Sequence, residues 1–250
     1  MYELTCSVEN ANEGLLKYVY DEVSTSIAKV GGVCKYLHGK CRSKFALACN
    51  ELYATTISRQ VEDCLINALT LGFKGLYLRD SLGISDDDLL LNTLVNTMCL
   101  FDNKFDKYYV KKSISLIGEI CIDGYYNFRM KGLKSKWNEL VEIVKNNNAL
   151  LRDTSLIKEF LCYLMDFFPQ GSSDISVVID NDTFRIFDEK GRLVPHLNLV
   201  CKSALEELVV ANAICIKPKA IKLYCNKQEL DEKFLDLLAY LFEVKVVQNS

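Results

Sequence analysis

The stretch GYYNFRMKGLKSKWNELVEIV, residues 124–144, decides how the middle of this chain is interpreted, because it combines basic and aromatic side chains with a regular apolar repeat. Wound on a helix at about 100° per residue, its large apolar side chains fall within one stripe about 80° wide. They are Tyr126, Met130, Leu133, Trp137, Leu140 and Val144. Such a stripe is typical of a helix that packs one face against a core. The pattern predicts a structural helix over 124–147 with Trp137, the only tryptophan, buried.

The basic side chains around this helix permit a second interpretation, a nucleic-acid surface. Residues 103–136 carry eight Lys and Arg against three acidic residues, a local net charge of +5. Rings that are exposed between cations can stack on bases while the cations hold phosphates. The candidate contacts are Arg129, Lys131 and Lys134. Because the rings of 124–144 align with Leu and Val, the sequence favours the structural helix and disfavours a nucleic-acid partner.

The composition is globular and carries no strong charge. Of 250 residues, half are apolar and a quarter are charged, with a formal net charge of −3 and a pI of about 5.6. No global basic field therefore attracts nucleic acid or an anionic membrane. No apolar run approaches the length of a membrane span, and the N-terminus lacks the features of a signal peptide. We expect a cytoplasmic protein without membrane insertion, whose eleven cysteines are mostly reduced, buried thiols.

The N-terminal two thirds of the chain combine a small strand element with long helices. Residues 2–8 have strand character, 12–30 have helical spacing, and 32–48 predict two short strands that turn near His38 and Gly39. Further helices are predicted at 50–71, 85–101, 107–122, 124–147 and 153–167. In the helix at 85–101, Ser85 is the expected N-cap and the three aspartates that follow it occupy the first turn.

The segment FFPQGSSD, residues 167–174, is the best linker in the chain. After it, strands at 175–179, 183–187 and 192–194 predict a β-meander, and a helix at 197–214 follows. The strand at 220–225, the helix at 228–242 and the strand at 244–248 predict a parallel β-α-β crossover. The predicted fold class is α+β, with a mainly helical domain at 1–168 that includes the N-terminal strand–helix–hairpin, and a small α/β domain at 172–250.

The sequence shows no catalytic signature. The only histidines are His38 and His196, and no nucleophile elbow, phosphate-binding loop or dinucleotide fingerprint occurs. One cluster, Cys34, His38, Cys41 and Cys49, has residue types that zinc prefers, but its C-x3-H-x2-C-x7-C spacing lacks the C-x2-C pair of structural zinc sites. We therefore expect no catalytic residue, cofactor or metal, with zinc at this cluster as the less favoured alternative.

Four segments carry a resemblance to a known family. They are NFRMKGLKSKWNELVEIV (127–144), SLIKEFLCYLMDFF (155–168), ISVVIDNDTFRIFDEKGRLV (175–194) and ALEELVVANAICIKPKAIKLYCN (204–226). In this order, and over residues 127–250, they resemble the YtxC-like family of sporulation proteins from spore-forming Firmicutes. The resemblance implies a cytoplasmic protein that is connected with sporulation and whose biochemistry is undefined. It brings no catalytic residues.

Three functions therefore need testing. The first is a non-enzymatic scaffold for protein interaction, with an unidentified protein partner. The second is nucleic-acid binding through residues 103–136. The third is a small-molecule site at the carboxyl ends of the C-terminal strands, where Asn226 and Lys227 follow the strand at 220–225. The same two residues also suit the start of a helix, and the oligomeric state does not follow from the sequence.

Overall fold

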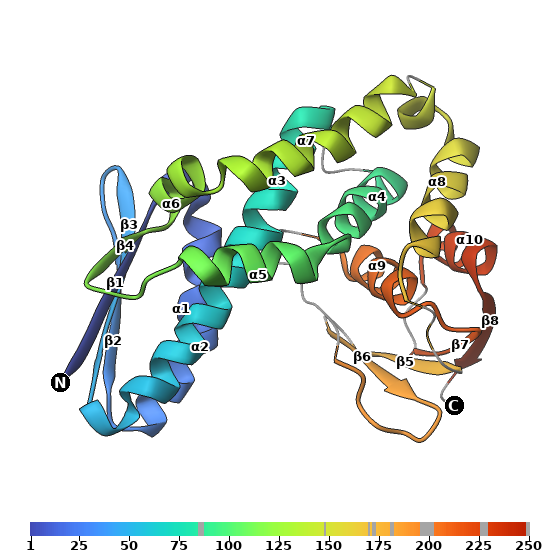
Figure 1. The fold of residues 1–250 in the computed structure, drawn as a ribbon. Coiled ribbons are helices and arrows are strands. Elements are labelled where there is room, and N and C mark those ends of the chain that lie inside the picture. Colours follow the sequence, from blue (N-terminus) through green and yellow to red (C-terminus); the bar gives the residue numbers. More distant parts are fainter. Residues whose placement is uncertain are drawn as a thin grey trace. The chain divides into compact units, whose positions relative to one another are not determined.

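The computed structural model describes residues 1–84, 88–147, 149–169, 171, 174–180, 183–195, 203–225 and 230–248. The chain forms two compact units: unit 1 is Met1–Tyr77 with Asp102–Glu139, and unit 2 is Leu78–Phe101 with Leu140–Ser250. Each unit holds one four-stranded mixed sheet together with helices, which confirms the α+β class (Figure 1). The contacts do not follow the predicted domains 1–168 and 172–250, because residues 78–101 and 140–168 belong to the unit of the C-terminal sheet. Among the described residues, no helix is long and apolar enough to cross a membrane.

The sheet of unit 1 has the strand order β2-β3-β1-β4. Its strands are β1 (Tyr2–Glu9), β2 (Val33–His38), β3 (Arg42–Cys49) and β4 (Glu119–Cys121). β1 is antiparallel to β3 and parallel to β4, and β2 and β3 form a hairpin. Helix α1 (Glu13–Lys29) packs on one face, where Leu4, Cys6 and Val8 are buried at alternate positions. The predicted N-terminal strand, helix and hairpin are confirmed.

The helices of unit 1 differ from the predicted ones in their limits. A π-helical turn, Ala68–Gly72, joins α2 (Ala54–Asn67) to α3 (Phe73–Leu82), so helical structure continues well beyond residue 71. Helix α5 (Asn103–Ser113) starts before residue 107 and ends before residue 122. The predicted helix at 107–122 is wrong in its second half, because Glu119–Cys121 pair with β1 as strand β4. A short apolar run suits both helix and strand, and here a partner from the start of the chain selects the strand.

The predicted helix over 124–147 is divided. Helix α6 (Ile122–Arg129) ends where Met130 leaves helical geometry with φ −99° and ψ 18°, and α7 (Lys131–Asn146) follows. The apolar stripe nevertheless faces inward: Met130, Leu133 and Val144 are buried, and Trp137 is only 1 % exposed. The prediction that the indole is buried is confirmed. The remaining members, Tyr126 and Leu140, are half-buried.

The sheet of unit 2 has the order β6-β5-β7-β8. Its strands are β5 (Ile175–Asp180), β6 (Thr183–Asp188), β7 (Ala220–Cys225) and β8 (Glu243–Gln248). The parallel pairing of β7 with β8 around α10 (Glu232–Leu241) confirms the predicted crossover. Of the meander, β5 and β6 form an antiparallel hairpin, and the third strand is reduced to a bridge between Phe187 and Leu193.

The other helices of unit 2 are α4 (Leu89–Leu100), α8 (Thr154–Asp166) and α9 (Leu205–Ile216), and both α4 and α8 contact α9. Short 3-10 turns occur at Asn10–Asn12, Glu51–Tyr53 and Leu150–Arg152. The N-cap of α4 is Asp88, whose Oδ1 accepts the N–H groups of Leu90 and Leu91 at 2.9 and 3.0 Å. The predicted cap Ser85 lies outside the described residues.

Candidate functional site

One side of α5 gathers cations and aromatic rings. The inner side of this helix is marked by Asn103, Asp106 and Val110, all of them buried. At about 100° per residue, five exposed side chains lie on the opposite side within an arc of about 120°. They are Lys104, Phe105, Tyr108, Lys111 and Lys112. Phe105 is 37 % exposed and Tyr108 is 58 % exposed. Three cations and two rings therefore share this arc, and none of the side chains on it is a carboxylate.

The rings of the arc are in contact with ammonium groups. Lys112 Nζ lies 4.3 Å from the ring centre of Tyr108, and Lys136 Nζ of α7 lies 3.6 Å from the ring centre of Phe105. These are cation–π distances. The second contact joins the arc to α7, and the nearby Arg129 at the end of α6 and Lys131 at the start of α7 are also exposed. We call the five side chains of the arc, with Lys136, the basic–aromatic surface.

Asp106, an acidic residue of α5, points into unit 1. Its Oδ2 accepts hydrogen bonds from Lys74 Nζ at 2.8 Å and from Trp137 Nε1 at 3.1 Å. All three side chains are almost completely buried. Burial raises the pKa of Asp106 above its ordinary value, although Lys74 and the indole N–H act in the opposite direction. The indole therefore anchors the core, and the carboxylate of Asp106 is held away from the cations of the arc.

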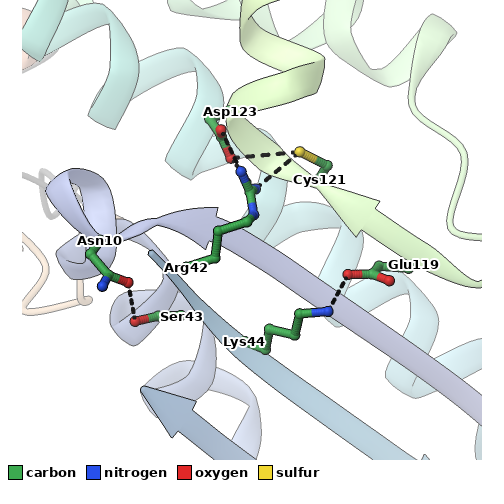
Figure 2. Close-up of polar contacts among 7 residues, drawn as sticks. All are labelled: Asn10, Arg42, Ser43, Lys44, Glu119, Cys121 and Asp123. Carbon is green, nitrogen blue, oxygen red and sulfur yellow. Dashed lines mark hydrogen bonds and ion pairs between the residues drawn. The ribbon is translucent and has the colours of Figure 1, made fainter. Parts of the chain in front are cut away.

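Asp123, at the start of α6, is bound by Arg42 of β3 (Figure 2). The guanidinium donates two hydrogen bonds, from Nη2 to Oδ1 at 2.6 Å and from Nη1 to Oδ2 at 3.1 Å. The same Nη2 lies 3.0 Å from Cys121 Sγ. Burial opposes ionisation of Asp123, but the bonds and charge of Arg42 outweigh it and hold the pKa of Asp123 below its ordinary value. Cys121 Sγ also donates to Asp123 Oδ1 at 3.7 Å. That carboxylate is bound by Arg42 through both oxygens and its pKa is lowered, which makes it a poor base for the thiol, so we interpret this cluster as structural.

Glu119, the third acidic residue of segment 103–136, pairs with Lys44 Nζ at 2.9 Å (Figure 2). Each acidic residue of this segment is thus paired with a cation from outside it. Among the described residues, none of the eight Lys and Arg of the segment lies within ion-pair distance of a carboxylate. Unit 1 holds 16 Lys and Arg against 13 Asp and Glu, a net charge of +3, whereas unit 2 holds 14 against 20, a net charge of −6.

The predicted nucleic-acid contacts fall into two groups. Arg129 and Lys131 are exposed. Lys134 is half-buried, with Nζ 3.6 Å from the ring centre of Tyr126, and burial lowers its pKa. Its ammonium is therefore engaged with a ring of the protein. The predicted helix at 107–122 leaves out Phe105, and without Phe105 the sequence does not single out Tyr108 within it. Their spacing of three residues was the signal that could have placed them on one face.

A second polar cluster, at the turn of the β2–β3 hairpin, has the composition of a catalytic triad without its geometry. His38 Nδ1 lies 2.9 Å from Glu13 Oε1 and 3.2 Å from Ser43 Oγ. A triad needs the acid and the hydroxyl on opposite ring nitrogens, and here both use the same one. Ser43 is also fully buried, and its Oγ donates to Asn10 Oδ1 at 3.1 Å (Figure 2). These contacts close the hairpin onto α1.

The candidate zinc ligands are spread along the hairpin. Cys34 and His38 stand four residues apart on β2, about 13 Å along a strand. Cys41 is exposed in the turn, and Cys49 is buried at the far end of β3. Burial raises the pKa of the Cys34 and Cys49 thiols, which disfavours the thiolate that zinc requires. Within the described part of the chain, no three His, Cys, Asp or Glu side chains are grouped so as to hold a metal ion.

The small-molecule hypothesis concerns residues that the structure does not describe. Asn226, Lys227 and His196 lie outside the described residues. Unit 2 does have a pocket where α4, α8 and α10 begin, with Asp88 and Asp231 in its lining. Both carboxylates accept N–H groups of their own helices, so those donors are already used. This pocket therefore gives no separate support for a ligand.

No protein-family model, curated protein or solved structure matches this chain. The resemblance of residues 127–250 to the YtxC-like family therefore stays a prediction. The geometry of the basic–aromatic surface is the observation on which a function can be based.

Proposed function

We propose that this protein is a non-enzymatic nucleic-acid-binding protein, and that the basic–aromatic surface holds the phosphate backbone. In accordance with the YtxC-like resemblance, we place this activity in the cytoplasm of a spore-forming bacterium. The sequence favours a protein partner over nucleic acid, because it shows no catalytic signature and the rings of 124–144 align with the buried apolar stripe. The exposed arc of α5 reverses that order, since it carries cations and rings without any carboxylate.

The single observation that supports this function is the unbalanced charge of the surface. Four exposed cations lie on it, and the three acidic residues of the same segment are occupied by Lys74, Arg42 and Lys44. Unpaired cations that lie close together repel one another. Binding of a phosphate backbone neutralises them and releases counterions from the nucleic acid. The net charge of −3 for the whole chain does not prevent this, because screening limits each charge to about 8–10 Å at physiological salt.

The test is fluorescence anisotropy with a labelled single strand of about 20 nucleotides and with the duplex of the same sequence, from about 50 to 200 mM salt. The variant Lys104→Ala, Lys111→Ala, Lys112→Ala removes the cations of the arc. We expect affinity to fall linearly with the logarithm of salt, and the variant to reduce the slope for the single strand by about 2.

A matched control removes three exposed lysines elsewhere in unit 1, with the changes Lys17→Ala, Lys29→Ala and Lys40→Ala. This control has the same net charge as the arc variant, and we expect it to keep the slope of the wild type. The proposal fails if neither nucleic acid binds at the lowest salt, or if the two variants lose affinity equally. Equal losses would mean that net charge, and not this surface, governs binding.

A protein-interaction scaffold is the second candidate, and edge strand β2 favours it. Cys34, Tyr36 and His38 alternate toward α1, so Val33 and Leu37 lie on the opposite face, where they are 72 % and 48 % exposed. Exposed apolar side chains on a strand edge are typical of protein contacts. Cross-linking in sporulating cells should identify one partner for the wild type and none for Val33→Lys, Leu37→Lys. An unchanged set of partners would exclude this strand.

A further inference from the structure

The exposed rings of the arc are not explained by phosphate binding. A surface that only holds phosphates has no use for exposed rings, and exposing Phe105 and Tyr108 to water is unfavourable. Both rings stand among Lys104, Lys111 and Lys112 on the outward side of one helix. They do not belong to the apolar stripe of α7, which is buried through Trp137.

We propose that this surface selects single-stranded over double-stranded nucleic acid, because Phe105 and Tyr108 stack on unpaired bases. This inference rests on the proposed function, since it concerns the ligand of the same surface. In a duplex the bases are stacked on one another and only phosphates meet the surface. A single strand offers the faces of its bases as well, and every base has such a face.

The arrangement of the two rings suits neighbouring bases. Phe105 and Tyr108 are three residues apart, so their side chains leave the helix on adjacent turns, with Cβ atoms about 5–6 Å apart. Each ring has an ammonium group close to it, Lys136 for Phe105 and Lys112 for Tyr108. When a base takes the face of a ring, the long lysine side chain turns to the phosphate of the same nucleotide. One ring and one lysine thus form a contact for one nucleotide.

The buried side chains of Lys74, Asp106 and Trp137 fix the orientation of α5. Asp106 lies between the two rings in sequence and is held on the inner side of α5 by Lys74 and Trp137. The bond to Trp137 also ties α5 to α7, the helix that supplies Lys136. The rings are therefore presented by a helix with a buried anchor, and their exposure is not the result of a frayed end.

The experiment measures the ratio of the affinities for the labelled single strand and for its duplex. We expect the wild type to prefer the single strand. The variant Phe105→Ala, Tyr108→Ala should lose about 5- to 150-fold in single-strand affinity for each ring, with duplex affinity unchanged within about twofold. Phe105→Leu, Tyr108→Leu should lose nearly as much, since leucine keeps apolar area without a flat face. Tyr53→Ala, at an exposed ring elsewhere in unit 1, should change neither affinity.

The outcomes separate this inference from the proposed function. If single strand and duplex bind equally and the ring variants change nothing, while the variant of Lys104, Lys111 and Lys112 still weakens binding, selectivity is refuted and the proposed function stands. If the leucine variant binds like the wild type, apolar contact and not stacking is responsible, which also refutes the inference. If neither nucleic acid binds, the proposed function itself fails.

Discussion

Replacing Lys74 by Met tests the buried ion pair that joins α3 to α5. Lys74, Asp106 and Trp137 are each at most 2 % exposed, so solvent screens their interaction little. Removing one partner of such a pair leaves an uncompensated charge and costs about 3–5 kcal/mol. We expect Lys74→Met and Asp106→Asn each to lower the free energy of unfolding by this amount. The double variant buries no charge, and the amide oxygen at position 106 can still accept the indole N–H, so it should lose only about 1 kcal/mol.

The assay is urea unfolding followed by tryptophan fluorescence, which reports on unit 1 because Trp137 is the only tryptophan. The decisive result is the order of the variants: the double variant should be more stable than either single variant. If the single variants each lose less than about 1 kcal/mol, or if their losses add in the double variant, the pair is not the buried element described above.

The pH dependence gives an independent check. Burial raises the folded-state pKa of Asp106 above its unfolded value, so the folded state takes up a proton first as the pH falls. The contribution of this group to stability therefore rises as the pH falls through the raised pKa. In Lys74→Met the ammonium no longer favours the carboxylate, and the loss of stability should shrink between about pH 7 and pH 5. The loss in Asp106→Asn should not shrink, because the titrating group is gone.

Three further predictions concern other parts of the chain. Arg42→Met should lower the free energy of unfolding by about 1–3 kcal/mol, less than a fully buried pair because Arg42 is one-third exposed. Because the pKa of Asp123 is lowered, this carboxylate stabilises the folded state at neutral pH, and the stabilisation is lost as the pH falls through the lowered pKa. In Arg42→Met the free energy of unfolding, measured with urea, should therefore decrease less as the pH falls. Asp88→Ala removes the N-cap of α4 and should lower the free energy of unfolding, followed by far-UV circular dichroism, by about 1 kcal/mol. An unchanged free energy of unfolding would refute the role of this cap. Iodoacetamide should label Cys41 and Cys121 first in peptide maps, because they are exposed. Burial raises the pKa of three thiols to about 12; they are Cys6, Cys64 and Cys215. If any of these is labelled earlier than Cys41 and Cys121, its burial in the core is contradicted.

The functional conclusion depends on which side of α5 faces the core. The sequence shows the charge excess of residues 103–136, and it correctly indicates that Trp137 is buried. It does not show that Asp106 is drawn inward by Lys74, a residue of another helix. With Asn103, Asp106 and Val110 inside, Phe105 and Tyr108 lie on the opposite side, because helical geometry fixes the angles between these positions. The conclusion about the surface thus depends on which side of α5 is buried.

The limits of the sequence are clearest at β4. Residues 114–122 are mostly apolar and fit a helix as well as a strand, and the sequence predicts the helix. Thr5, Cys6 and Ser7 pair with Glu119, Ile120 and Cys121 and make this segment an edge strand. Arg42 then reaches Asp123 at the start of the following helix. No pattern within residues 114–122 indicates that they pair with β1, because that strand is more than 100 residues away in the chain.

By itself the sequence determined the features that follow from the spacing of apolar side chains within one segment. They are the N-terminal strand, helix and hairpin, the buried stripe of Trp137, and the crossover of β7, α10 and β8. These follow from side-chain directions along one helix or strand, which each segment carries within itself. The tertiary structure alone decided the break at Met130, the strand at Glu119–Cys121 and the outward position of the rings on α5. Each of these depends on a partner distant in sequence, since pairing and burial are properties of segments that meet only in the folded chain.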